Sequence, residues 1–249
     1  MTPHKIASSA EWLEARKALL AKEKEFNRLR DDLSRQRREL PWERVEKTYV
    51  FDGPDGKETL ADLFDGRRQL VVYHFMFGPG WEAGCKSCSF WADNFNNILP
   101  HLNARDVTLI AVSRAPLKDF AAFKQRLGWT FRWVSSFEND FNHDYHVSFT
   151  PEEIAKGENF YNYEYGRRYP PESPGISVFY KDGAGEVFHT YSAYRRGVEA
   201  MMGTYTLLDL TPKGRDEHDG AMAWVRHHDR YEPAPAAKAA PGSGSSCHT

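Results

Sequence analysis

The sequence predicts an α/β domain built on a mostly parallel central sheet. Three β-rich runs, LVVYHFMF (70–77), VTLIAVS (107–113) and FRWVSS (131–136), alternate with segments of helical pattern. Continuous apolar runs are typical of strands buried on both faces, and their alternation with helices is typical of right-handed βαβ crossovers. With 249 residues, 41% of them hydrophobic, the chain is long enough to bury a core.

A helical arm is expected over residues 1–47. Ser8 and Glu11 have the spacing of a capping box, and Pro41 marks the far end of the helix. Between them a narrow apolar stripe recurs every seven residues on an otherwise charged helix; it consists of Trp12, Leu19, Phe26, Leu33 and Leu40. Such a helix either lies across a domain surface or pairs with another helix, for instance in a homodimer, and both interpretations remain open.

The main domain is expected over residues 48–232. Apart from the three runs above, its predicted elements are a strand entering a turn (49–57), a helical turn ending at Gly66 (58–66), two amphipathic helices (90–102 and 117–128), a hairpin (176–191) and a last helix (197–208). The hairpin turn is DGAG, residues 182–185. Residues 233–249 are rich in Pro, Ala, Gly and Ser and are expected to form a flexible tail.

Residues 139–175 interrupt this alternation. The segment is unusually aromatic, with Phe141, Tyr145, Phe149, Phe160, Tyr161, Tyr163, Tyr165 and Tyr169. Only TPEEIAKG (150–157) has the pattern of a capped helix. We expect an insertion that folds over the sheet as a lid.

Composition excludes several classes of function. The 33 Lys+Arg are balanced by 35 Asp+Glu, so no basic excess points to nucleic acid. The sequence has no apolar stretch long enough for a membrane span, and its first residues lack an apolar signal region, so we expect a cytoplasmic protein. Neither a Gly-rich phosphate loop nor a GxSxG motif is present, and no cofactor is expected.

Cys85 and Cys88 form the sharpest motif, CKSC, which lies between a buried strand and an amphipathic helix. At a helix start, free amide N–H groups and the helix dipole stabilise a thiolate, and Lys86 adds a positive charge. The first cysteine is expected to be exposed and to attack a disulfide, and the second, deeper one to resolve the mixed disulfide.

Two other interpretations of Cys85 and Cys88 are that they bind a metal ion or that they are buried and inert. A zinc site would need two ligands besides the CxxC pair, and the only further cysteine lies in Cys247-His248 of the tail. A second polar cluster consists of Asp140, His143, Asp144 and His146. On an irregular segment alternate side chains point apart, so we expect no metal there. Cys247 is either an additional resolving thiol or a stray tail cysteine.

The residues around the motif resemble the thioredoxin superfamily. VYHFMFGPGWEAGCKSCSFWADN (72–94) and PGISVFYKDGAGEVFHTYS (174–192) are similar to a thioredoxin-like family labelled a domain of unknown function and described as predicted dithiol–disulfide oxidoreductases. The resemblance extends to about Tyr231. It implies a thioredoxin fold, in which helices flank a central mixed sheet. It also implies a disulfide or thiol substrate (a small molecule or a peptide) and a reductant that the sequence does not identify.

The resemblance also suggests roles for single residues. Cys85 matches the nucleophile and Cys88 the resolving cysteine. Trp81 resembles the tryptophan that precedes the motif in thioredoxins, although here it is four residues upstream. Pro174 is the best match for the cis-proline that thioredoxins place opposite the cysteines, with Gly175 intervening before the strand. His74 either lies beneath the resolving thiol and accepts its proton, or is a satisfied core histidine.

Two alternatives to the oxidoreductase remain. The stretch from Tyr49 to Phe75 resembles the opening of peroxiredoxins, yet Glu82 stands three residues before Cys85, where those peroxidases have Thr or Ser. The other alternative is a non-catalytic interaction protein or redox sensor on a thioredoxin fold.

Overall fold

The structure, a computed structural model, describes residues 4–166 and 169–232. Its centre is a mixed eight-stranded sheet with strand order β1-β10-β9-β4-β5-β6-β2-β3, and β7 and β8 form a separate pair. The sheet is not mostly parallel, because only β4–β5 and β5–β6 pair in parallel and its other strand pairs are antiparallel. The strands are β1 Glu43–Arg44, β2 Val50–Gly53, β3 Gly56–Thr59, β4 Gln69–His74, β5 Val107–Ser113, β6 Arg132–Ser135, β7 Asn159–Tyr161, β8 Glu164–Gly166, β9 Gly175–Lys181 and β10 Val187–Tyr194.

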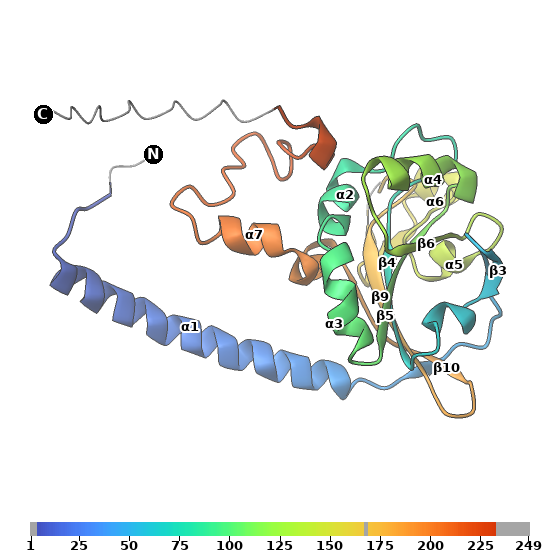
Figure 1. Cartoon of the computed structure of the whole chain (residues 1–249), viewed down its shortest axis with the longest axis horizontal. Coiled ribbons are helices and arrows are strands. Elements are labelled where there is room, and N and C mark those ends of the chain that lie inside the picture. Colours follow the sequence, from blue (N-terminus) through green and yellow to red (C-terminus); the bar gives the residue numbers. More distant parts are fainter. Residues whose placement is uncertain (1–3, 167–168, 233–249) are drawn as a thin grey trace, which may run out of the picture.

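Helices cover this sheet and extend from it (Figure 1). The α-helices are α1 Ser9–Arg38, α2 Lys86–Ala92, α3 Leu99–Asn103, α4 Leu117–Arg126, α5 Phe141–Asp144, α6 Pro151–Lys156 and α7 Gly203–Leu208. Four 3₁₀ helices are described, η1 Asp62–Phe64, η2 Asn96–Ile98, η3 Arg195–Met201 and η4 His228–Arg230. None of the described helices has the length and apolar character that a bilayer span requires.

The strand directions confirm the predicted thioredoxin-like fold. β4, which precedes the CxxC motif, lies near the middle of the sheet and runs parallel to β5, with Val72 opposite Ile110. On its other side β4 is antiparallel to β9, with Tyr73 opposite Ile176, and β9 continues into the hairpin with β10. In a thioredoxin-like fold, the strand that precedes the CxxC motif is expected to lie between a parallel strand and an antiparallel hairpin, as β4 does here.

Two large cores lie on the two faces of the sheet, and a third, smaller cluster consists of Val147, Phe149, Tyr161 and Tyr194. One packs Tyr73 and Phe75 of the β4 segment against α2 and α4, and it includes Cys88. The other packs Leu70 and Val72 against the first strands and α5. Successive strand residues point to opposite faces, so neighbouring residues of β4 belong to different cores.

Three predicted elements differ in detail. ETL of residues 58–60 is not helical: β3 pairs with β2 in a hairpin, because Gly56 at φ 123° permits the tight turn. The helix predicted over 90–102 is broken into α2, η2 and α3. Pro100 lacks the N–H that a continuous helix needs, and the Asn96 side chain is engaged by Gly128 and Thr130 instead. The last predicted helix is divided between η3 and α7.

The arm α1 begins as predicted, because Ser8 Oγ accepts the Glu11 N–H (3.3 Å) and the Glu11 carboxylate accepts the Ser8 N–H (2.9 Å). The helix has no buried residue and extends away from the sheet (Figure 1). Trp12 and Phe26 of the stripe are 61% and 64% exposed. The interpretation that the stripe lies across the domain surface is therefore wrong.

We propose that the stripe pairs with α1 of a second copy, because pairing would remove its apolar side chains from water. We predict that the full chain sediments as a dimer and that Leu19→Glu combined with Phe26→Glu yields a monomer. Arg28→Glu, on the charged surface of α1 opposite the stripe, makes the same change in net charge; it is the control and should stay dimeric. Sedimentation velocity over a concentration series measures this, and a wild-type chain that stays monomeric throughout contradicts the pairing.

Candidate active site

Cys85 lies at the N-cap position of α2, where the loop after β4 turns into the helix. Its N–H donates to the Met76 carbonyl (3.0 Å), which ties the start of the helix to the end of the β4 segment. Gly84 permits this approach, because a Cβ there would lie 2.7 Å from the Phe75 ring. The cysteine is partly exposed.

Cys88 lies one helical turn further on and is fully buried. The Met76 N–H donates to its sulfur (3.4 Å). Both thiols are free. The motif therefore presents an accessible sulfur with a second, buried one behind it.

The two thiols have opposite pKa shifts. The Cys88 thiol, as hydrogen-bond donor to the Cys85 sulfur, lowers the pKa of Cys85 to about 6; burial opposes this, and the N–H groups of Cys88 and Ser87 reinforce it. Burial raises the pKa of Cys88 well above its ordinary value, and its bond to Cys85 raises it further. At neutral pH this favours a thiolate at Cys85 and a protonated thiol at Cys88.

Of the two interpretations of His74, the structure favours the core histidine, because the side chain does not lie beneath Cys88. Its ring packs against Phe141 and Tyr145 in the other core, and its Nε2 is 2.8 Å from Ser177 Oγ. Burial lowers the pKa of His74 to about 3, which keeps it neutral. It is a core histidine.

Tyr73 takes the place predicted for His74. Its hydroxyl is fully buried and has no hydrogen-bond partner of ordinary geometry within the described residues. Burial raises the pKa of Tyr73, the Cys88 sulfur raises it further, and the Tyr73 hydroxyl in turn lowers the pKa of Cys88. The alternation of side chains along β4, which places Tyr73 and Phe75 on the face of α2, is the sequence signal that identifies it.

The other predicted residues surround the motif less closely. Trp81 is 36% exposed on the loop before Cys85. The Lys86 ammonium donates to the Ala223 carbonyl (3.1 Å) and so binds the C-terminal segment. Pro174 precedes β9, but the described residues contain no cis peptide bond, and its carbonyl accepts the Tyr161 hydroxyl (2.6 Å).

The aromatic insertion contributes to both faces of the sheet. Tyr161 is near the motif: burial raises the pKa of its hydroxyl, and the charge of Cys88 adds to that rise. Tyr145 instead packs with Phe141 and Phe179 in the opposite core. A lid over the dithiol formed by the whole insertion stays a prediction.

A C-terminal segment that the sequence did not point to borders Cys85 on both sides. We call residues 223–229 the strap. His227 Nε2 donates to the carbonyl of Gly84 (2.9 Å), the residue before Cys85, and Ala223 accepts from Lys86, the residue after it. Val225 is fully buried between these contacts. Figure 1 shows this segment beside the start of α2.

The four residues weighed as metal ligands have separate partners. The Lys47 ammonium donates to Asp140 (2.8 Å) and Asp144 (2.7 Å), whereas His143 contacts Arg114 and His146 packs on Phe160. No group of three His, Cys, Asp or Glu that could hold a metal ion occurs in residues 4–166 and 169–232. Cys247, His248 and the predicted tail lie outside the described residues.

Comparison with curated proteins finds no match to this sequence. Among solved structures, the chain is similar to peroxidoxin BcpB of Mycobacterium tuberculosis (TM-score 0.44, 13% identity, 66% of this chain and 95% of that one). It is also similar to a peroxiredoxin Q variant of Xanthomonas campestris (0.42, 16%, 68% and 97%) and to the bacterioferritin comigratory protein of that organism (0.45, 15%, 64% and 88%). Since each TM-score is below 0.5, none of these similarities bears on activity.

A family model gives the identification. The model for the bacterial proteins of unknown function DUF899 matches residues 1–231, which include the arm, the dithiol motif and the strap. The chain therefore belongs to the DUF899 family.

Proposed function

We propose that the protein is a dithiol–disulfide oxidoreductase that acts through Cys85 and Cys88 in a reducing cytoplasm. One observation carries the proposal: an accessible thiol of lowered pKa at a helix N-cap lies in front of a buried thiol one turn away. Nucleophilic attack needs the accessible thiol of lowered pKa, and resolution of the mixed disulfide needs the second thiol within reach of the first.

The reaction has two exchange steps. The Cys85 thiolate attacks one sulfur of a substrate disulfide, the substrate S–S bond breaks, and the first substrate thiol leaves with a proton from solvent. Cys88 then loses its proton and attacks the Cys85 sulfur, which releases the second substrate thiol and forms the Cys85–Cys88 disulfide. The substrate gains two electrons, and an external thiol or dithiol reductant restores the pair.

Tyr73 has a function in the second step. Cys88 is buried and must become a thiolate, which its surroundings disfavour. The Tyr73 hydroxyl, which has no other partner of ordinary geometry in the described chain, can donate to that developing charge. It is a positioning residue for Cys88.

The surroundings of Cys85 favour small substrates over extended peptides. The Pro174 carbonyl already accepts the Tyr161 hydroxyl, which competes with an N–H from a bound peptide. The strap also borders Cys85 through Gly84 and Lys86. A low-molecular-weight disulfide needs neither backbone pairing nor wide access.

No observation favours the peroxidase alternative, because the residue three positions before Cys85 is the exposed Glu82 and not a hydroxyl donor. A redox sensor would use the same thiols without turnover. Catalytic reduction of a disulfide substrate by the protein separates the oxidoreductase from the sensor.

The pH dependence of alkylation tests the activated nucleophile. We expect the reduced protein to contain one thiol that titrates near pH 6 with iodoacetamide, because the Cys88 thiol stabilises the Cys85 thiolate. This titration should be absent in Cys85→Ser. In Cys88→Ala it should remain but move upward, since alanine removes the thiol that donates to the Cys85 sulfur. Two thiols with ordinary pKa values would refute the proposal.

Replacing Tyr73 tests resolution. We predict that Tyr73→Phe leaves the alkylation rate of Cys85 almost unchanged but slows release of the second substrate thiol by about tenfold or more, the effect of one hydrogen bond to a charged group. Stopped-flow kinetics with 5,5′-dithiobis(2-nitrobenzoate) would detect the accumulated mixed disulfide. Tyr165→Phe, at a 75% exposed tyrosine, is the matched control. Equal rates in both variants contradict the assigned role.

The strap is tested by probes of different size. His227→Ala removes the bond to Gly84, so we predict that Cys85 reacts several-fold faster with a bulky maleimide and only slightly faster with iodoacetamide. His218→Ala, whose side chain is 90% exposed, is the control. If His227→Ala accelerates both reagents equally or neither, the strap does not select by size.

A further inference from the structure

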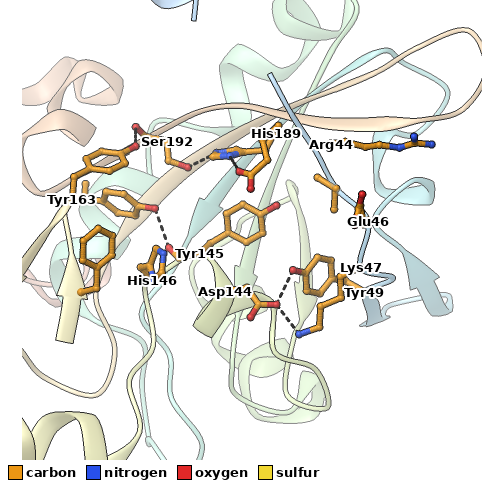
Figure 2. Close-up of a pocket in the computed structure, with 14 residues that line it drawn as sticks. Arg44, Glu46, Lys47, Tyr49, Asp144, Tyr145, His146, Tyr163, His189 and Ser192 are labelled. Atoms are coloured by element: carbon orange, nitrogen blue, oxygen red, sulfur yellow. Dashed lines mark hydrogen bonds and ion pairs between the residues drawn. The ribbon is translucent and has the colours of Figure 1, made fainter. Parts of the chain in front are cut away.

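A second candidate binding site lies on the sheet face opposite the dithiol. It is a hollow of about 670 Å³, in the size range of small-molecule sites. Its walls come from the segment after α1, the end of α5, the β7 region and β10 (Figure 2). Tyr49 and Tyr145 of this lining belong to the core that excludes Cys88.

Aromatic rings form much of the wall, and one of them carries a free hydroxyl. Tyr145 is 9% exposed; its carbonyl accepts the Tyr194 hydroxyl (3.0 Å), whereas its own hydroxyl makes no hydrogen bond to the described residues. Figure 2 shows this hydroxyl pointing into the space between His189 and Tyr49. Tyr163 and Tyr194 extend the aromatic surface. The hydroxyl is open to the hollow, so it is available to a ligand as a hydrogen-bond partner.

A chain of hydrogen bonds fixes the polar side of the hollow. His189 Nε2 lies 2.8 Å from Ser192 Oγ, which lies 2.8 Å from Ser177 Oγ. Ser177 Oγ lies 2.8 Å from His74 Nε2 in the core. This network holds His189 in place from behind and gives the buried His74 a structural role.

The charges around the hollow favour a cation. Lys47 is neutralised by Asp140 and Asp144, and Arg44 pairs with Glu186, which is not part of the wall. Two other carboxylates of the wall have little or no positive charge beside them to balance their negative charge. Glu43 is 3.5 Å from His189 Nδ1, and Glu46 makes no ion pair within residues 4–166 and 169–232.

We infer that this hollow binds a protonated organic amine. The tyrosine rings attract a cation through their faces, the Tyr145 oxygen accepts an N–H, and Glu43 and Glu46 supply the negative charge. An anion would meet two carboxylates, and a neutral aromatic molecule would gain only the ring contacts. The site neither contains nor needs the cysteines, so it is separate from the proposed redox activity.

Isothermal titration of the reduced full chain with three probes of similar shape tests the inference. Benzylammonium is expected to bind about tenfold tighter than benzyl alcohol, from cation–π and carboxylate attraction, and benzoate weakest of all. Cys85→Ser should bind benzylammonium like the wild type, which separates this site from the dithiol. Equal affinity for benzylammonium and benzyl alcohol, tighter binding of benzoate, or no binding of benzylammonium overturns the inference.

Variants locate the site. Tyr145→Phe should weaken benzylammonium several-fold, and Glu43→Gln combined with Glu46→Gln should remove most of its advantage over benzyl alcohol. Glu14→Gln combined with Glu25→Gln makes the same change in net charge on the arm and is the control. If both double variants change affinity equally, the attraction comes from net charge and not from this hollow.

Discussion

The contact between the two thiols is the interaction on which the account of this site depends. Cys88 donates to Cys85, so one sulfur becomes a thiolate while the other keeps its proton. The surrounding structure serves to hold that geometry. Met76 bonds to both cysteines, Gly84 lets the loop approach Phe75, and the helix places the second sulfur one turn behind the first. A dithiol with identical surroundings for both sulfurs would lack this division of roles.

The alternation of β4 divides the molecule into two regions of different chemistry. Tyr73 faces the dithiol and is part of its core, whereas His74, the next residue, faces away and supports the aromatic hollow. The insertion bridges the two regions, because Tyr145 lines the hollow and Tyr161, whose pKa the charge of Cys88 raises, packs against Tyr194 of the same lining. A single sheet thus separates a proposed redox site from a proposed ligand site.

Much of the fold follows from the sequence, because the strands are continuous apolar runs and the helix caps are local. VTLIAVS corresponds to β5, and the Ser8–Glu11 capping box begins α1 as predicted. The errors arise where long-range contacts decide. The two interpretations of His74 stayed open, because the core that lies on its side of the sheet is formed by residues far apart in the chain, such as Phe141 and Ser177. The strap could not be foreseen, because His227 meets Gly84 only through a contact between residues 143 positions apart.

Direct observation of the oxidised pair tests the central claim. The reduced protein would be equilibrated in glutathione buffers of graded potential, quenched with acid, alkylated and analysed by peptide mass spectrometry. The account predicts one reversible two-electron transition in which Cys85 and Cys88 become linked to each other, with little glutathione retained on either. A stable glutathione adduct on Cys85 that Cys88 never displaces, or no oxidation of the pair at any potential, would contradict it.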